Sequence, residues 1–284
     1  MGVVIPQVVS EDRAGGAQVI DGGLRFDSGK SQYVGRTYSS SPSNNTKITI
    51  SLWCKRNKLD SGNTWYTLLW GYNGSSSYES VLAFKNDQIW TRTTGGASPY
   101  DLQTTAVYRD ISSWYHIVLS IDTTQVTPSN RAILYVNGVQ VTSFGTANYP
   151  VQNSSTQFLY PNANNAIGGT VGYASYFDGS ISNMYVIDGQ ALDPSYFGFT
   201  DPLTNTWRPK KLSSSVAYGT NGFYLPFDGS APIGQDQSGR GNNWTPVNFG
   251  GSTALDKATG ALPILNTTPS GKSATVGVRT DNNP

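Results

Sequence analysis

The sequence is poor in the side chains that carry acid–base, nucleophilic and metal chemistry. Its 284 residues include one cysteine, Cys54, one histidine, His116, and two glutamates, Glu11 and Glu79. A single cysteine excludes a disulfide within the chain, so the fold must depend on its core, where we expect Cys54 to be buried. Only 13% of the residues are charged and the net charge is +1. Nothing therefore indicates the basic surface that nucleic-acid binding requires.

The scarcity of glutamate and histidine also bears on enzymatic function. A glycosidase needs two carboxyl groups about 5 Å or about 6.5–9.5 Å apart. Glu79 has no acidic residue at nearby alternating positions, and Glu11 lies in a terminal segment. No serine sits in a Gly-x-Ser-x-Gly motif, and His116 falls within a strand pattern, where we expect it to be a packed structural residue. We therefore predict no catalytic residue and no enzyme activity.

Long apolar runs are absent as well. No stretch approaches the run of about 18 apolar residues that a membrane-spanning helix requires. The first ten residues lack the charged and apolar regions of a signal peptide. What the chain does contain is 12% aromatic residues and 31 glycines. Aromatic residues among turn formers favour a folded, all-β protein.

Alternating patterns predict many short strands. Residues 48–54 alternate apolar and polar positions, and residues 114–122 alternate two mainly apolar faces, which is typical of a strand inside a two-sheet sandwich. Asn137 and Gly138 between two apolar runs predict a type I′ hairpin turn. We predict further strands at 66–70, 80–84, 88–92, 181–187 and 223–227, and one helical turn capped by Asp193 at 194–197.

Three regions follow from these patterns. Residues 1–19 are predicted to form an extended N-terminal arm, because Pro6 interrupts its apolar residues. Residues 20–199 form the sandwich, and residues 200–284 form a linker and a C-terminal extension. The motif Phe177-Asp178-Gly179-Ser180 recurs at residues 227–230. The repeat reflects either a shared strand-and-turn composition or the start of a second, incomplete copy of the domain.

Several motifs, in their order and spacing, resemble laminin-G-like domains of the concanavalin A-like type. They are Gly23-Leu24-Arg25-Phe26-Asp27 with Tyr33-Val34, Ile48-Thr49-Ile50-Ser51-Leu52-Trp53, Trp114-Tyr115-His116-Ile117-Val118-Leu119, Leu134-Tyr135-Val136-Asn137-Gly138-Val139 and Phe177-Asp178-Gly179-Ser180-Ile181-Ser182-Asn183. The resemblance covers residues 20–198. It implies a two-sheet antiparallel jelly-roll sandwich, here with extended N- and C-terminal arms.

A narrower resemblance links residues 4–9, 187–194 and 224–245 to tail-fibre or virion proteins of marine phages. It implies a non-enzymatic virion protein, assembled in the host cytoplasm, that forms a homo-oligomer such as a trimer and contacts other virion proteins through its terminal arms. Three roles stay open at this point. The chain could be a tail or head fibre adhesin, a capsid decoration protein that stabilises the shell, or a free carbohydrate-binding module.

Aromatic residues near loops are the candidate ligand-binding residues. Trp65, Tyr66, Tyr72 and Tyr78 flank the loop at 71–77, and Trp90 and Tyr100 flank a second loop. Aromatic rings can stack on sugar rings while polar side chains fix the hydroxyls, so a host-surface glycan is the expected ligand. The alternative is that at least half of these rings pack in the core or between subunits.

Calcium is the one metal that the resemblance suggests. Laminin-G-like domains often hold Ca²⁺ through Asp carboxylates and loop carbonyls, which are the oxygen ligands that this cation prefers. Asp178, Asn183 and Asp188 lie near the predicted closing strand and are the candidate ligands. The alternative is that Asp-Gly pairs form ordinary turns. No other cofactor is expected.

Overall fold

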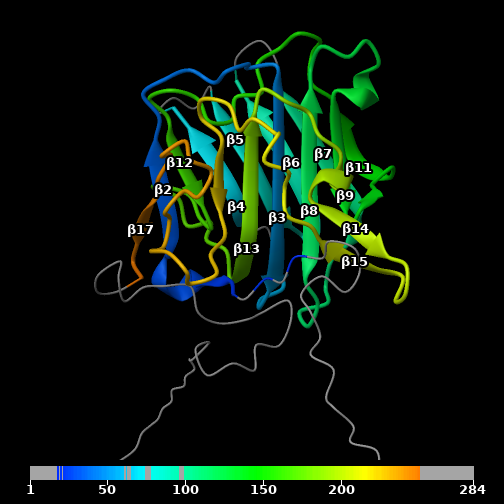
Figure 1. The fold of residues 1–284 in the computed structure, drawn as a ribbon. Coiled ribbons are helices and arrows are strands. Elements are labelled where there is room, and N and C mark those ends of the chain that lie inside the picture. Colours follow the sequence, from blue (N-terminus) through cyan, green and yellow to red (C-terminus); the bar gives the residue numbers. More distant parts are fainter. Residues whose placement is uncertain are drawn as a thin grey trace, which may run out of the picture.

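Two antiparallel sheets lie face to face in the computed structural model, which describes residues 18, 20, 22–60, 62, 65–73, 78–95 and 99–249 (Figure 1). Within these residues, one sheet has seven strands in the order β1-β13-β3-β8-β9-β10, with β16 also paired to β13. The other has eight strands in the order β11-β7-β6-β5-β4-β12-β2-β17. The predicted all-β jelly-roll sandwich is confirmed.

The strands are short, as expected for a sandwich. The seven-stranded sheet consists of β1 (Leu24–Phe26), β3 (Lys47–Arg56), β8 (Tyr115–Asp122), β9 (Ala132–Val136), β10 (Val139–Gln140), β13 (Gly179–Asp188) and β16 (Phe223–Leu225). The eight-stranded sheet consists of β2 (Tyr33–Thr37), β4 (Trp65–Tyr72), β5 (Glu79–Lys85), β6 (Gln88–Thr94), β7 (Tyr100–Val107), β11 (Phe144–Asn148), β12 (Asn164–Ile167) and β17 (Thr245–Val247). A separate hairpin pairs β14 (Gly198–Asp201) with β15 (Thr206–Pro209).

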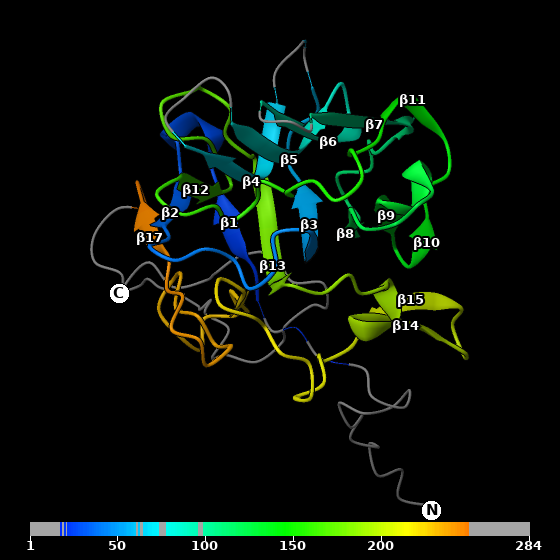
Figure 2. The same cartoon turned by 90° about the horizontal axis from the view of Figure 1, so that it is seen from above.

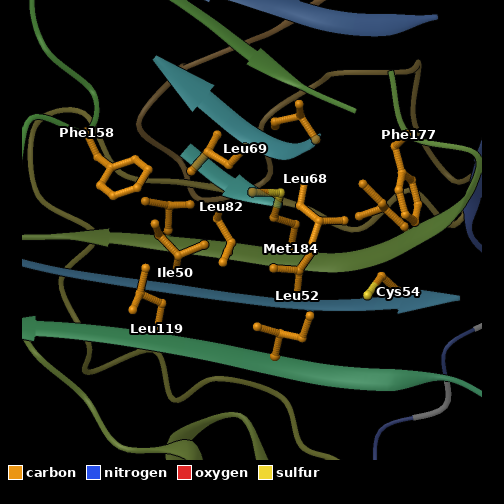
Figure 3. Close-up of a cluster of buried hydrophobic side chains, with 14 of the residues drawn as sticks. Ile50, Leu52, Cys54, Leu68, Leu69, Leu82, Leu119, Phe158, Phe177 and Met184 are labelled. Atoms are coloured by element: carbon orange, nitrogen blue, oxygen red, sulfur yellow. The ribbon is translucent and has the colours of Figure 1, made fainter. Parts of the chain in front are cut away.

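The main core lies between the two sheets. The alternating residues Ile50, Leu52 and Cys54 of β3 point toward leucines of the opposite sheet, such as Leu68 and Leu82 (Figure 3). Every one of these side chains is buried. Cys54 is therefore a core residue, as predicted, and its burial raises the pKa of its thiol.

The turns with the clearest sequence patterns have the predicted conformations. Asn137 and Gly138 have φ angles of 50° and 80° and join β9 to β10 in the predicted hairpin. The predicted helical turn is the 3-10 helix η3 (Pro194–Tyr196), in which the Asp193 side chain accepts from the Ser195 backbone N–H at 2.8 Å. The other helices in the described residues are the single turns η1 (Ser28–Lys30) and η2 (Pro128–Asn130). None of the three is long or apolar enough to cross a membrane.

Residues after β13 cover one face of the sandwich. In Figure 2, β14 and β15 and the yellow and orange segments lie on the outer side of the seven-stranded sheet. This segment also returns to the sandwich, because β16 pairs with β13 and β17 pairs with β2. The region predicted as a linker and extension therefore contributes a strand to each sheet. Of the predicted arms, residues 1–17 and 19 and residues 250–284 lie outside the described part.

The repeated Phe-Asp-Gly-Ser motif has one structural setting. Phe177 and Phe227 both place their rings 6.4 Å from the ring of Phe26, at edge-on angles of 62° and 90°. Both copies of the motif therefore pack around the same residue of one core. This arrangement explains the repeat without a second domain at residues 223–244.

Trp207 of β15 attaches the covering hairpin to the seven-stranded sheet. Its indole N–H donates to Nδ1 of His116 at 2.9 Å, and Ser51 Oγ lies 2.9 Å from Nε2 of the same imidazole. Because indole nitrogen only donates, His116 is the neutral Nε2–H tautomer, which donates to Ser51. The imidazole also stacks on Trp53 at 4.8 Å and on Trp207 at 5.9 Å. The prediction of a packed, locally hydrogen-bonded histidine is confirmed.

Candidate functional site

Half of the aromatic residues that were predicted to bind a ligand lie on the outer face of the eight-stranded sheet. Trp65 and Tyr72 of β4 and Trp90 of β6 belong to one cluster on this face, separate from the core between the sheets. Trp65 and Tyr72 are half-buried, whereas Trp90 is 1% exposed. Figure 2 shows no labelled strand or helix on this outer side of the sheet. We call the cluster and its polar neighbours the aromatic face.

Two of the predicted ligand residues point the other way. Tyr66 and Tyr100 are 6% and 3% exposed and belong to the core between the sheets. The Tyr66 hydroxyl donates to the carbonyl of Leu59 at 3.2 Å, and that of Tyr100 is hydrogen-bonded to Thr91 Oγ1 at 2.8 Å. Desolvation raises the pKa of both phenols. Neither ring is available for stacking on a ligand, because alternation along the strand directs them inward.

Tyr78 lies next to the face rather than within it. It precedes β5, is half-buried, and its carbonyl accepts from the Asn73 backbone N–H at 3.3 Å. This hydrogen bond closes the loop that joins β4 to β5. Its position agrees with the expected place beside the loop at 71–77, most of which lies outside the described residues.

Further aromatic residues on the face were not predicted, among them Trp70 and Tyr173. Trp70 stacks on Tyr72 with ring centroids 5.4 Å apart, and Tyr173 contacts both rings edge-on at 6.2 Å and 6.0 Å. Tyr173 is 53% exposed, and its hydrogen bond raises the pKa of Tyr72. Trp70 was missed because simple alternation places its side chain on the other face of the sheet from that of Trp65. A β-bulge between Thr67 and Leu69 shifts the register and returns Trp70 to the outer face.

Arg92 of β6 supplies the charge at the centre of the aromatic face. Its guanidinium carbon lies 4.7 Å from the ring centre of Trp90 and 5.1 Å from that of Trp65, which are cation–π distances. Nη2 donates to Glu79 Oε2 at 2.8 Å, and the Trp70 indole N–H donates to Glu79 Oε1 at 2.9 Å. The Nε atom of Arg92 is buried and has no hydrogen-bond partner in the described residues. The result is a rigid patch of rings with fixed polar groups between them.

The hairpin turn between β5 and β6 brings this patch together. Asn86 and Asp87 both have positive φ angles, 55° and 61°, so that Lys85 pairs directly with Gln88. This register places Glu79 one diagonal step from Arg92, within reach across neighbouring strands. The sequence pattern that could have predicted the Glu79–Arg92 contact is the two-residue turn Asn86-Asp87, because both residue types tolerate a positive φ angle.

A second carboxylate lies on the same face. Asp101 of β7 pairs with Arg92 in the register, and its Oδ1 accepts from the Trp90 indole N–H at 2.9 Å. Both oxygens of Glu79 are already acceptors for Arg92 and Trp70. These two hydrogen bonds hold the Glu79 carboxylate in one orientation across the face.

The three candidate calcium ligands do not form one site. Asp178 and Asp188 lie at opposite ends of β13, about 30 Å apart at the rise of an extended strand. Asp188 accepts from the backbone N–H groups of Ser43 and Asn221 at 2.7 Å and 2.9 Å. The Asn183 side chain accepts from the Tyr224 hydroxyl at 2.9 Å. These side chains serve loop contacts, and the described residues contain no cluster of three or more acidic, His or Cys ligands.

Asp178 likewise has local partners. Its Oδ2 accepts from Ser28 Oγ at 2.8 Å, and the ammonium of Lys58 lies 3.7 Å away. The calcium assignment at Asp178, Asn183 and Asp188 is therefore wrong as a single site, because an antiparallel strand separates residues that are near in sequence.

Comparison with known proteins agrees with this architecture. The family described as "Concanavalin A-like lectin/glucanases superfamily" matches residues 28–195, which is more than half of the chain. No curated protein matches the chain.

Several solved structures are similar in outline. They include a native heptameric SAP-like pentraxin from Limulus polyphemus (14% identity over 61% of this chain and 78% of that chain, TM-score 0.39), a sialidase CBM40 from Ruminococcus gnavus bound to α2,3-sialyllactose (21%, 58% and 89%, TM-score 0.41) and domains LG4-5 of the mouse laminin α1 chain (12%, 75% and 50%, TM-score 0.43). By the family match, the chain belongs to the concanavalin A-like lectin/glucanases superfamily and is a laminin-G-like domain.

Proposed function

We propose that the chain is a non-catalytic saccharide-binding domain and that the aromatic face is its binding surface. The observation that carries this proposal is the patch around Arg92, where the partly accessible rings of Trp65 and Tyr72 lie beside a fixed Arg92–Glu79 ion pair. The buried indoles of Trp70 and Trp90 support this patch from beneath. Aromatic rings provide a flat apolar surface, and polar groups of fixed orientation distinguish the hydroxyls of a sugar. Tyr72 and Tyr173 extend the platform toward solvent.

Saccharide titration of two variants tests this proposal. Trp65→Ala and Tyr72→Ala should each lower the affinity for a bound oligosaccharide about tenfold, because each removes one stacking surface. Tyr196→Ala is the matched control, because Tyr196 is 40% exposed and lies in η3, away from the aromatic face. A glycan array on the intact chain would supply the oligosaccharide. The aromatic face would be excluded as the binding surface by either of two results: an equal loss of affinity in the control, or no loss in any variant.

A glycosidase at the same face is the alternative, because Glu79 and Asp101 both lie there. The hydrogen bonds of Glu79 to Arg92 and to the Trp70 indole instead favour a structural role for this carboxylate. Incubation of the intact chain with the oligosaccharide that it binds decides the matter. Release of reducing ends that disappears in both Glu79→Gln and Asp101→Asn would replace the binding function with hydrolysis.

We further propose that this domain is displayed on a phage particle, as a tail or head fibre adhesin. The support is the resemblance of residues 187–194 and 224–245 to marine phage virion proteins, together with a binding face on one side of the molecule. Residues 200–249 pack on their own sandwich, so contacts with neighbouring virion proteins would fall to residues 1–17 and 250–284. Repeated weak sites on one particle would add avidity.

Immunogold labelling of particles whose genome encodes the chain tests this placement. Label on fibres supports an adhesin, and label spread over the shell supports the alternative of a capsid decoration protein. Absence of the chain from purified particles, by mass spectrometry, would favour a free carbohydrate-binding module.

A further inference from the structure

A groove lies on the other side of the molecule from the aromatic face. It has a volume of about 630 Å³ and runs between the segment at 211–218 and the loop at 228–240, over β13 and β16. This volume is within the range of sites that bind small molecules. The groove belongs to the covering segment, and neither the sequence patterns nor the family match points to it.

Three tyrosines form one wall of the groove. Tyr185 and Tyr224 stack in parallel, with ring centroids 4.2 Å apart and an angle of 3° between the planes, and Tyr218 lies nearby in the lining. The Tyr185 side chain is 1% exposed, and its hydroxyl interacts with Tyr224 and the Leu212 backbone. Tyr185 therefore supports the wall from beneath, and the half-buried rings of Tyr218 and Tyr224 face the groove.

The rim of the groove carries excess positive charge. Lys211 and Arg240 line the groove and are exposed, and neither forms an ion pair within the residues that the structure describes. The single acidic residue in the lining, Asp228, uses Oδ1 to accept from the backbone N–H and the hydroxyl of Ser230. With two exposed cations and one carboxylate in its lining, the groove carries a net positive charge, which favours an anionic ligand.

We propose that this groove binds an acidic saccharide, at a second site independent of the aromatic face. The half-buried rings of Tyr218 and Tyr224 provide the apolar contact that a sugar ring needs, and the serines and Gln237 along the groove provide groups that pair with hydroxyls. Lys211 and Arg240 take the carboxylate or sulfate of the ligand. A neutral sugar would leave both cations unpaired, which is why the acidic class fits better.

Titration with matched probes tests the groove. We would follow the intact chain by NMR with trigalacturonic acid, its full methyl ester, 3′-sialyllactose and a sulfated heparin disaccharide. At least one acidic probe should bind with millimolar affinity or better and shift the signals of residues 211–218 and 237–240, and the methyl ester should bind more weakly. If no acidic probe shifts these signals, or if the ester binds as well as the acid, the proposal fails.

Charge variants separate this site from general attraction. Lys211→Ala and Arg240→Ala should each weaken binding of the acidic probe about fivefold. Lys210→Ala is the matched control, because the Lys210 ammonium donates to the Ser195 carbonyl outside the groove at 3.1 Å. It removes the same charge and should change affinity less than about twofold. Equal losses in all three variants would show non-specific attraction and overturn the proposal.

The two proposals fail independently. Trp65→Ala on the aromatic face should leave binding of the acidic probe unchanged. Loss of that binding in Trp65→Ala, with no effect of Lys211→Ala, would assign the acidic probe to the aromatic face and remove the groove as a site. The thermal unfolding midpoints of Lys211→Ala and Arg240→Ala should match that of the native chain, since both side chains are exposed.

Discussion

The two outer faces of the sandwich carry similar residues in different surroundings. On the seven-stranded sheet, His116 and Tyr185 point outward and are buried under the segment that contains β14 and β15. On the eight-stranded sheet, Trp65, Tyr72 and Tyr173 remain accessible in part. An outward aromatic residue is therefore packed under a covering segment on one face and partly accessible on the other, and the difference lies in what covers the sheet.

The largest expected effect on stability comes from detaching the β14–β15 hairpin that covers the seven-stranded sheet. Trp207→Ala should lower the free energy of unfolding by about 3 kcal/mol, because it empties the space beside Gly138 and Gly198 and leaves Nδ1 of His116 without a donor. A Cβ at Gly138 or Gly198 would lie 2.4 or 2.5 Å from the indole, which shows how closely Trp207 is packed. Urea unfolding measures the change.

The matched variant lies on the open face. Trp65→Ala also removes a partly buried indole, but from the face on which Figure 2 shows no labelled strand or helix, and should cost only about 1 kcal/mol. Equal costs for the two variants would contradict the view that the faces differ in their cover.

Acidic pH should weaken the covered face next. Burial lowers the pKa of His116 to about 3, below the value of about 6.5 in an unfolded chain. Between these values the unfolded state binds the extra proton, so stability falls as pH falls below about 6.5 and stops falling near pH 3. By this linkage, His116 alone should cost about 2–3 kcal/mol between pH 7 and pH 4.5.

His116→Gln isolates that contribution from the carboxylates. Glutamine does not titrate in this range, so the variant should lose less stability than the native chain over the same pH interval. Urea unfolding at the two pH values gives the difference. Identical pH dependence in both proteins would mean that the pKa of His116 is the same in the folded and the unfolded chain, against the effect of burial.

The ion pair of the open face should matter less. Glu79→Gln keeps an acceptor for the Trp70 indole but leaves Arg92 between Trp65 and Trp90 without a counter-charge. We expect a loss of about 1–2 kcal/mol, because the Glu79 side chain is 14% exposed and that of Arg92 27%. Asp27→Asn is the control, since the Asp27–Lys30 pair is 3.8 Å long and exposed, and should cost less than about 0.5 kcal/mol. Chemical unfolding of both variants compares them, and similar costs would show that the ion pair is no more than a surface contact.

Periodicity was enough to predict the strands whose neighbours obey simple rules. The alternation in residues 48–54 and the turn at Asn137-Gly138 were both correct, because each depends on local geometry. The apolar outer positions of β8 predicted burial on both faces, but not which segment covers them. That cover comes from residues far along the chain, whose pairing with β13 no local pattern specifies.

The candidate site shows the same limit in more detail. Tyr66 and Tyr100 were predicted to bind the ligand because they lie beside loops, although strand alternation directs their side chains into the core. Trp70 was missed because one bulge reverses the alternation of β4. Arg92 and Asp101 came together with Glu79 only through the register of three strands. Residues that cooperate across strands depend on that register, which a single sequence specifies only where a turn type is recognisable.

The smallest change in stability should accompany a clear change in binding. Tyr173 is 53% exposed and contacts Trp70 and Tyr72 at the edge of the aromatic face. Tyr173→Ala should alter the free energy of unfolding by less than about 0.5 kcal/mol, because little of the side chain is buried. Its affinity for the oligosaccharide should fall severalfold, since a ring is lost from the platform. Tyr173→Phe keeps the ring, so it should retain most of the affinity if stacking dominates. Calorimetric titration of both variants separates the two contributions: a loss in Tyr173→Phe as large as in Tyr173→Ala would assign recognition to the hydroxyl, and no loss in either would place the sugar away from this edge.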